Sequence, residues 1–205
     1  MSSEFFKRVL SSIILIPLIF FFIIQESIII FYFTIICFLI SCYEWHMMTK
    51  NKFYKYYGFL FLLISFYTFY EVSNELFDVI FVIIICISTD MGGYFFGKIF
   101  KGPKLTKISP NKTYAGMIGG YFLSLLSLTI IYTLLDYKES LIKLLILAIL
   151  ISTISQIGDI SISYFKRLSK IKNTGKLIPG HGGLLDRIDG MLFSFPLYYL
   201  FSLTG

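Results

Sequence analysis

Long apolar segments dominate this chain and restrict its fold more than any other feature. Seven stretches approach or reach the roughly 20 mostly apolar residues that a membrane-spanning helix needs. Only 15% of the 205 residues are charged, against about 25% in soluble domains. We therefore predict an all-α fold, a polytopic integral membrane helical bundle with about seven transmembrane helices. The predicted spans are Val9–Ile24, Ser27–Tyr43, Tyr54–Tyr70, Leu76–Phe96, Thr113–Leu135, Ser140–Gly158 and Leu184–Leu203.

The basic residues are divided unequally between the two sides that these spans define. Sixteen of the 18 Lys and Arg residues fall on the side that holds the N-terminus, and only Lys138 and Lys143 fall on the other. Because basic loops stay in the cytoplasm, we predict a cytoplasmic N-terminus and an external C-terminus. Attraction to anionic lipid accounts for the sign of these loops as well.

Four aspartates lie at the predicted cytoplasmic ends of the spans. Asp90 ends the fourth span, Asp159 ends the sixth, and Asp186 and Asp189 open the seventh. A charge at bilayer depth costs roughly 2.5–3.5 kcal/mol, so it usually faces a polar cavity. For any one of them an Asp–Lys pair at the interface is an equally simple interpretation. Their collection on one side of the membrane favours a shared site.

The spacing of these residues places several of them on common helical faces. Asp186 and Asp189 are three residues apart, which puts them on one face of a helix. Ser155, Asp159 and Ser163 follow at intervals of four and also share one face. Two helices could therefore direct carboxylates toward each other.

Cations and glycines accompany the carboxylates. If the sixth span continues as a helix beyond the membrane, Lys166 and Arg167 lie on that extension. Mg²⁺ is typically held by one or two carboxylates together with substrate phosphates, and Arg suits phosphate oxygens through its planar fork. Gly182 and Gly183, next to His181, let the backbone pass close to a ligand. This combination predicts a phosphorylated substrate and a divalent metal.

One segment closely resembles a known family signature. The residues "SYFKRLSKIKNTGKLIPGHGGLLDRID", Ser163 to Asp189, are similar without a gap to the signature of the phosphatidate cytidylyltransferases, also called CDP-diacylglycerol synthases. The stretches "SQIGDISISYFKR", "STDMGGYFFGKIF" and "KISPNKTYAG", and "YEW" at Tyr43–Trp45, resemble the same family. The resemblance covers residues 40–205. It implies a single domain over 1–205, with a divergent and shortened part at 1–40 and the motif-bearing catalytic part at 88–205.

The resemblance implies a function for the chain. The family transfers a cytidylyl group from CTP to phosphatidic acid and gives CDP-diacylglycerol and pyrophosphate, with Mg²⁺ and a second, monovalent cation such as K⁺. The implied catalytic residues are Lys166, Arg167, His181 and Arg187; the substrate-binding residues are Asp90, Lys112, Ser155, Ser163, Lys172, Gly182 and Gly183; and the metal ligands are Asp159, Asp186 and Asp189. We expect a bacterial inner membrane or an equivalent organellar one, a site facing the cytoplasm, contact with membrane lipid and no nucleic-acid partner. A homodimer fits this expectation as well.

The chain departs from the family pattern at Asn173, where the family has Asp after the lysine that corresponds to Lys172. An amide oxygen can still coordinate a cation but brings no negative charge. Because Asp159, Asp186 and Asp189 remain in place, we interpret this position as one that orients a loop.

Two other classes of function stay open on the sequence alone. A transporter also places ionisable residues in its spans, although usually near the bilayer midplane. A membrane cytidylyltransferase that acts on an ether-linked or isoprenoid lipid phosphate would share the same motifs, because no residue pattern here identifies the lipid tails.

Overall fold

The computed structural model describes residues 27–50, 52–135, 140–175, 177 and 182–203. Within these ranges the chain forms six α-helices and no β-sheet, which confirms the all-α prediction. The helices are α2 (Ser27–Met48), α3 (Lys55–Val72), α4 (Leu76–Phe100), α5 (Tyr114–Leu135), α6 (Leu141–Leu168) and α7 (Leu185–Ser202). They match six of the seven predicted spans, and the predicted span Val9–Ile24 lies outside the described residues.

Four of the described helices, α2, α4, α5 and α6, are long and apolar enough to cross a membrane. Helices α3 and α7 are shorter, at 18 residues each. Helix α3 begins with Lys55 and two tyrosines, and α7 carries two aspartates and an arginine in its first turns. The chain is thus an integral membrane protein by its helices, but the count of about seven spans is not confirmed.

Helices α2 and α6 extend furthest beyond the predicted ends of their spans, while α3 and α4 extend by two and four residues, to Val72 and Phe100. Helix α2 continues past Tyr43 to Met48, and α6 continues past Gly158 to Leu168. The acidic residue at each predicted end, Glu44 or Asp159, is neutralised or hydrogen-bonded by partners from other segments, so it does not stop the helix. The last turn of α6 carries Lys166 and Arg167, which confirms the predicted helical extension.

The described helices group into two compact units. The first comprises residues 1–79 and 165–189, and the second comprises residues 80–164 and 190–205. The boundaries between the units fall inside α4, α6 and α7. The division does not test the prediction of a single domain, which stays a prediction.

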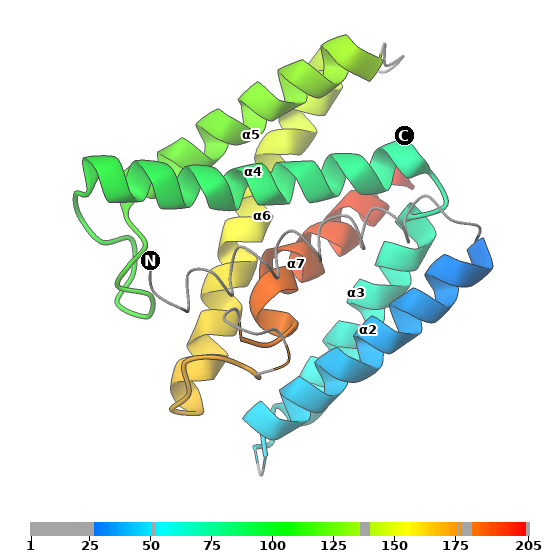
Figure 1. Cartoon of the computed structure of the whole chain (residues 1–205), viewed down its shortest axis with the longest axis vertical. Coiled ribbons are helices and arrows are strands. Elements are labelled where there is room, and N and C mark those ends of the chain that lie inside the picture. Colours follow the sequence, from blue (N-terminus) through cyan, green and yellow to red (C-terminus); the bar gives the residue numbers. More distant parts are fainter. Residues whose placement is uncertain (1–26, 51, 136–139, 176, 178–181, 204–205) are drawn as a thin grey trace. The chain divides into compact units, whose positions relative to one another are not determined.

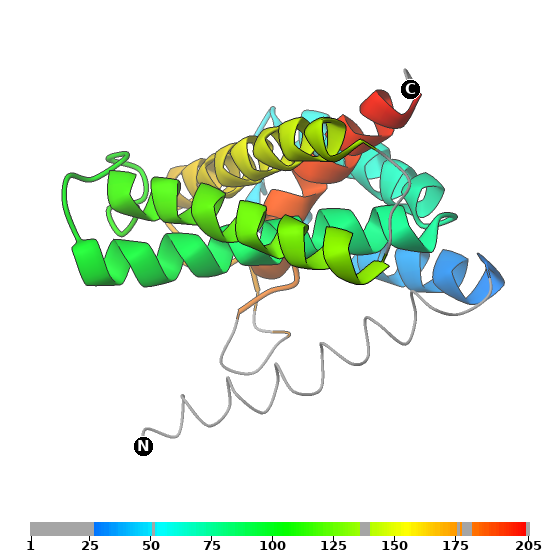
Figure 2. The same cartoon turned by 90° about the horizontal axis from the view of Figure 1, so that it is seen from above.

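In the first unit, α2 and α3 lie side by side (Figures 1 and 2). Trp45 near the end of α2 donates a hydrogen bond from its indole Nε1 to the carbonyl oxygen of Lys55 at 3.0 Å. The ring of Phe165 meets the same indole edge to face, with 5.2 Å between centroids. Gly58 leaves the space that the indole fills. Trp45 therefore fixes the end of α2 against α3 and the end of α6.

In the second unit, α4 and α5 pack backbone against backbone next to the loop that joins them (Figure 2). A Cβ atom added to Gly116 of α5 would lie 2.6 Å from the carbonyl oxygen of Gly93 of α4. Small residues permit such close helix crossings in membrane proteins. Thr89 of α4 also donates a hydrogen bond to Ser152 of α6 at 2.9 Å. These contacts bring the loop before α5 close to both α4 and α6.

Replacing Gly116 with valine should separate α4 from α5, because the added carbons overlap the backbone of Gly93. Overpacking of this kind typically costs about 1–3 kcal/mol. We expect a lower thermal unfolding temperature in detergent than that of the neighbouring variant Ala115→Val, since Ala115 is partly exposed. Equal unfolding temperatures for the two variants would contradict the tight crossing.

Candidate active site

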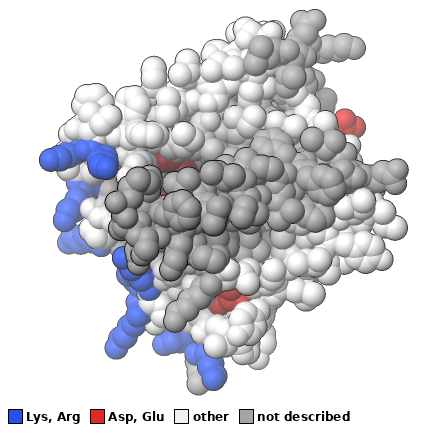
Figure 3. Space-filling model, viewed as in Figure 1, with Lys and Arg blue, Asp and Glu red and all other residues white. Residues whose placement is uncertain are grey.

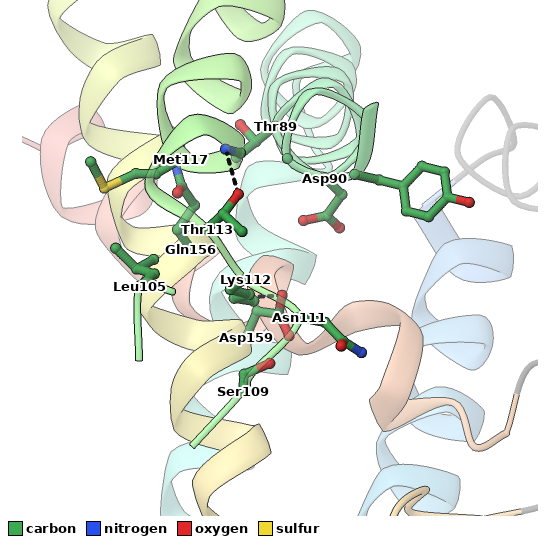
Figure 4. A pocket seen from close by; sticks show the side chains of 13 residues that line it. Thr89, Asp90, Leu105, Ser109, Asn111, Lys112, Thr113, Met117, Gln156 and Asp159 are labelled. Carbon is green, nitrogen blue, oxygen red and sulfur yellow. Dashed lines mark hydrogen bonds and ion pairs between the residues drawn. The ribbon is translucent and has the colours of Figure 1, made fainter. Parts of the chain in front are cut away.

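A cavity of about 300 Å³ lies in the second unit between α4, α6 and the loop that precedes α5 (Figure 4). Most of the residues that line it are polar or charged. The lining residues are Thr89, Asp90, Gly93, Tyr94, Leu105, Ser109, Asn111, Lys112, Thr113, Gly116, Met117, Gln156 and Asp159. Three residues that the sequence indicated as site residues, Asp90, Lys112 and Asp159, are therefore brought together.

Charged side chains of both signs face this cavity. The ammonium group of Lys112 and the carboxylate of Asp159 form an ion pair, and their side chains are 23% and 28% exposed. Asp90 directs its carboxylate from α4 into the same cavity (Figure 4). Two carboxylates and one ammonium group thus share a small, water-accessible space, an arrangement suited to a cation and to phosphate oxygens.

Neutral polar residues complete the cavity, and the sequence analysis did not select them. Ser109, Asn111 and Gln156 line it beside the charged groups. The hydroxyl of Thr113 accepts a hydrogen bond from the backbone N–H of Gly116 at 3.1 Å and so caps the start of α5. The signals that could have found these residues are the stretches "KISPNKTYAG" and "SQIGD", whose family resemblance was noted only as a whole.

The first unit holds a second cluster around Asp186. Lys166 donates a hydrogen bond to Oδ1 of Asp186 at 2.8 Å, in an ion pair whose side chains are only 11% and 6% exposed. Oδ2 of Asp186 accepts hydrogen bonds from the backbone N–H groups of Thr174 at 2.8 Å and Gly183 at 3.0 Å, and from the hydroxyl of Thr174 at 3.1 Å. This carboxylate therefore ties α6, the turn at Thr174 and the start of α7 together.

Glu44 of α2 enters the same cluster, and the sequence analysis did not select it. Its carboxylate accepts hydrogen bonds from the backbone N–H groups of Leu184 and Leu185, each at 2.9 Å. The hydroxyl of Thr174 lies 2.9 Å from its Oε2. The signal for Glu44 was the resemblance of "YEW" to an acidic–aromatic pair of the family, which alone did not mark it as a site residue.

The predicted glycines pack closely against these two carboxylates. Gly182 has a φ of +96°, which L-residues with side chains rarely adopt, and a Cβ there would lie 2.7 Å from Oδ2 of Asp186. A Cβ on Gly183 would overlap Thr174 and Glu44. Close packing thus explains why both positions hold glycine. Their binding of substrate stays a prediction.

The remaining predicted residues are more scattered. Arg167 is exposed and donates a hydrogen bond to the carbonyl oxygen of Ile171 at 3.2 Å. Ser155 is fully buried, where Gly190 packs against its hydroxyl. His181 lies outside the described residues. Of the others, Lys172 and Arg187 are exposed, while Ser163 and Asp189 are buried.

The predicted metal ligands belong to different units. Asp159 lies in the second unit, and Asp186 and Asp189 lie in the first. Within the described ranges, no group of three or more His, Cys, Asp or Glu side chains lies close enough together to hold a metal ion. Asp90 and Asp159 still fit Mg²⁺, which commonly takes one or two protein carboxylates and completes its shell with phosphates and water. Asp186 fits less well, because both its oxygens already accept hydrogen bonds.

The fold and the cavity describe a helical membrane protein with a charged site lined by α4, α6 and the loop before α5. A family model described as "Cytidylyltransferase family" matches residues 56–204. The chain belongs to this family, which confirms the family predicted from the signature.

The names of curated relatives are consistent with this family assignment. Proteins named phosphatidate cytidylyltransferase from Staphylococcus saprophyticus, Staphylococcus aureus and Staphylococcus epidermidis are each 40% identical to the chain over 136 residues. The aligned region covers 65% of this chain and 52% of each relative. The chain thus spans about half the length of the curated relatives it matches.

Proposed function

We propose that this protein transfers the cytidylyl group of CTP to phosphatidic acid and releases pyrophosphate, in phospholipid biosynthesis. The observation that carries the proposal is the cavity in which Asp90, Lys112 and Asp159 meet, in a member of the cytidylyltransferase family. The names of the curated relatives supply the substrate class.

The reaction needs charge neutralisation more than proton transfer. A phosphate oxygen of the lipid forms a bond to the α-phosphorus of CTP, while the bond from that phosphorus to the bridging oxygen breaks and pyrophosphate leaves with the electron pair. The attacking oxygen is already anionic, so no strong general base is required. Positioned positive charge therefore supplies most of the catalysis. We assign this role to Lys112, which lines the cavity, and the exposed Arg167 and Arg187 are further candidates.

The carboxylates of the cavity would hold a divalent cation. Asp90 and Asp159 offer the oxygen ligands that Mg²⁺ prefers. When bound, Mg²⁺ would neutralise part of the phosphate charge of CTP. Asp186 and Asp189 stay further candidates for metal binding, and a second, monovalent cation such as K⁺ is proposed on the family resemblance alone.

The proposed site faces the cytoplasm of a bacterial inner membrane or an equivalent organellar membrane, where CTP is found. The loop joining α4 and α5 supports this orientation, because it is rich in lysine and stands beside the cavity. Some of the Lys and Arg side chains visible in Figure 3 lie over this loop, whereas α5 itself carries no charged residue. Basic loops are typically cytoplasmic.

The topology proposal can be tested with fusion reporters. With seven spans and a cytoplasmic N-terminus, a reporter fused after Gly205 should report the external side, and one inserted in the α4–α5 loop after Gly102 should report the cytoplasm. The reason is the concentration of 16 of 18 basic residues on one side. A C-terminal reporter that is active in the cytoplasm would contradict the odd number of spans.

The lipid substrate can be identified by measuring pyrophosphate release from CTP by the purified protein. We expect release that requires phosphatidic acid and Mg²⁺ and that stops with EDTA. An isoprenoid phosphate and an ether-linked lipid phosphate serve as competing substrates in parallel reactions. A faster rate with either would redirect the proposal to the alternative lipid, and no release with any lipid would favour a transporter.

Asn173, where the family has Asp, allows a test of whether a carboxylate is needed at this position. It is exposed and borders Gly182, where an added Cβ would lie 3.3 Å from the Asn173 side chain. We expect Asn173→Asp to change the cytidylyltransferase rate by less than about fivefold, because an exposed charge pair contributes only about 0–1 kcal/mol. A Mg²⁺ titration of both forms provides the measurement. An inactive Asn173→Asp variant would show that the site has been rebuilt around the amide.

A further inference from the structure

Among the residues that the structure describes, Glu44 is the most deeply buried acidic residue that the proposed reaction does not use. Only 4% of the residue is exposed, and it precedes residues 56–204, which the family model matches. Its hydrogen-bond partners nevertheless all lie in the signature segment, some 130–141 residues further along the chain. An acid from α2 therefore contacts the segment that carries most of the predicted site residues.

This contact supplies hydrogen-bond acceptors for the backbone N–H groups at the start of α7. The first N–H groups of a helix have no acceptor within the helix, and the positive end of its dipole favours a negative charge. The carboxylate of Glu44 accepts two of these N–H groups, those of Leu184 and Leu185. Since Trp45, the next residue, is fixed by Lys55 and Phe165, Glu44 provides a rigid cap rather than a mobile one.

The hydroxyl of Thr174 couples Glu44 to Asp186. It lies 2.9 Å from Oε2 of Glu44 and 3.1 Å from Oδ2 of Asp186. A hydroxyl has one proton, so it can donate to only one of the two carboxylates at a time. Asp186 in turn receives the ammonium group of Lys166 at 2.8 Å. A displacement of Glu44 would therefore reach Lys166 through Thr174 and Asp186.

Two glycines of the signature segment, Gly175 and Gly183, pack directly against the carboxylate of Glu44. A Cβ on Gly175 would lie 2.7 Å from Oε1 of Glu44, and a Cβ on Gly183 would overlap the same carboxylate. The backbone of the signature segment thus approaches the carboxylate as closely as it can. This fit indicates that the segment is shaped around Glu44.

We propose that Glu44 is a positioning residue, which holds the turn at Thr174 and the start of α7 so that Asp186 and Lys166 keep their places. Its effect on turnover rests on the proposed cytidylyltransferase function, whereas its effect on the start of α7 does not. Glu44→Gln keeps the shape and one acceptor oxygen, and Glu44→Ala removes both acceptors. The matched control is Glu75→Gln, because Glu75 is exposed in the turn before α4.

Two measurements test the proposal. Hydrogen exchange of the peptide that contains Leu184 and Leu185 should be faster in Glu44→Ala than in the unmodified protein, with little change in peptides from α5. The kcat should fall by at least about tenfold in Glu44→Gln and further in Glu44→Ala, as expected for lost hydrogen bonds to a charged group, while the KM for phosphatidic acid stays within about twofold. The control should match the unmodified protein in both.

Unchanged exchange at the start of α7 in Glu44→Ala would overturn the proposal, whatever the activity. Faster exchange throughout the chain would also overturn it, because Glu44 would then serve global stability. A kcat equal to that of the unmodified protein in both variants would equally contradict a positioning role. If the unmodified protein shows no cytidylyl transfer, the proposed function fails, and the exchange result still decides whether Glu44 holds the start of α7.

Discussion

Asp159→Asn is expected to lower the rate of cytidylyl transfer by at least about a hundredfold. The substitution keeps the shape of the side chain and deletes a charge that lines the cavity beside Asp90 and pairs with Lys112. Removing one preorganised electrostatic group from an active site typically costs about 10²–10³ in rate. The measurement is the initial rate of pyrophosphate release from CTP and phosphatidic acid at saturating Mg²⁺.

The matched control for this substitution is Asp78→Asn. Asp78 lies in the first turn of α4, the helix that carries Asp90 twelve residues further along. We expect near-normal turnover from the control and a normal thermal unfolding temperature from both variants, since Asp159 is partly exposed. Asp159→Asn with turnover close to that of the control would remove the cavity from the proposed mechanism.

Lys166→Met is expected to destabilise the protein by about 3–5 kcal/mol, the usual result of breaking a buried ion pair from one side. Its partner Asp186 would keep its backbone donors but lose the cation that neutralises it, in surroundings where its side chain is only 6% exposed. The double variant Lys166→Met/Asp186→Asn removes both charges, and the Asn oxygen can still accept from Thr174 and Gly183. We expect the double variant to recover most of the lost stability.

Thermal unfolding in detergent measures the stability of the single and double variants. The rate of cytidylyl transfer measures whether each variant is active. The double variant should stay inactive even where its stability recovers, because the pair is expected to organise the signature segment for the reaction. A single variant as stable as the unmodified protein would show that the ion pair does not form, and an active double variant would show that the reaction does not need it.

Most of the helices could be predicted because apolar run length is a local property. Each of the six described helices begins within about two residues of its predicted start. The ends of four helices were predicted too early, and those of α2 and α6 differ most from the prediction. Their acidic residues, Glu44 and Asp159, resemble span ends in the sequence, and the partners that accommodate them come from distant segments.

The candidate site was predictable as a set of residue types, but not as an arrangement. Asp90, Lys112 and Asp159 stood out because they are charges at the ends of apolar segments. Their shared cavity depends on the close crossing of α4 and α5 at Gly93 and Gly116, which no spacing rule reveals.

Asp186 shows that the sequence does not reveal which groups a charged side chain contacts. Its role as a metal ligand stays a prediction, and the sequence did not reveal that its oxygens accept hydrogen bonds from Lys166, Thr174 and Gly183. These donors come from a turn and a helix end whose conformation depends on tertiary packing. Glu44 was missed for the same reason, because a single acid near the end of an apolar run carries no sequence signal of the helix it caps.

The proposed function requires that the cytidylyl group moves from CTP to a membrane lipid. It is tested most directly by incubating the purified protein with phosphatidic acid, Mg²⁺ and CTP radiolabelled at its α-phosphorus, and then extracting the lipids. We expect the label to enter the lipid fraction as CDP-diacylglycerol, label placed on the γ-phosphorus to leave as pyrophosphate, and Asp159→Asn to slow both by at least about a hundredfold. Label from the α-phosphorus that stays entirely in the aqueous phase, with folded protein and both substrates present, would contradict it.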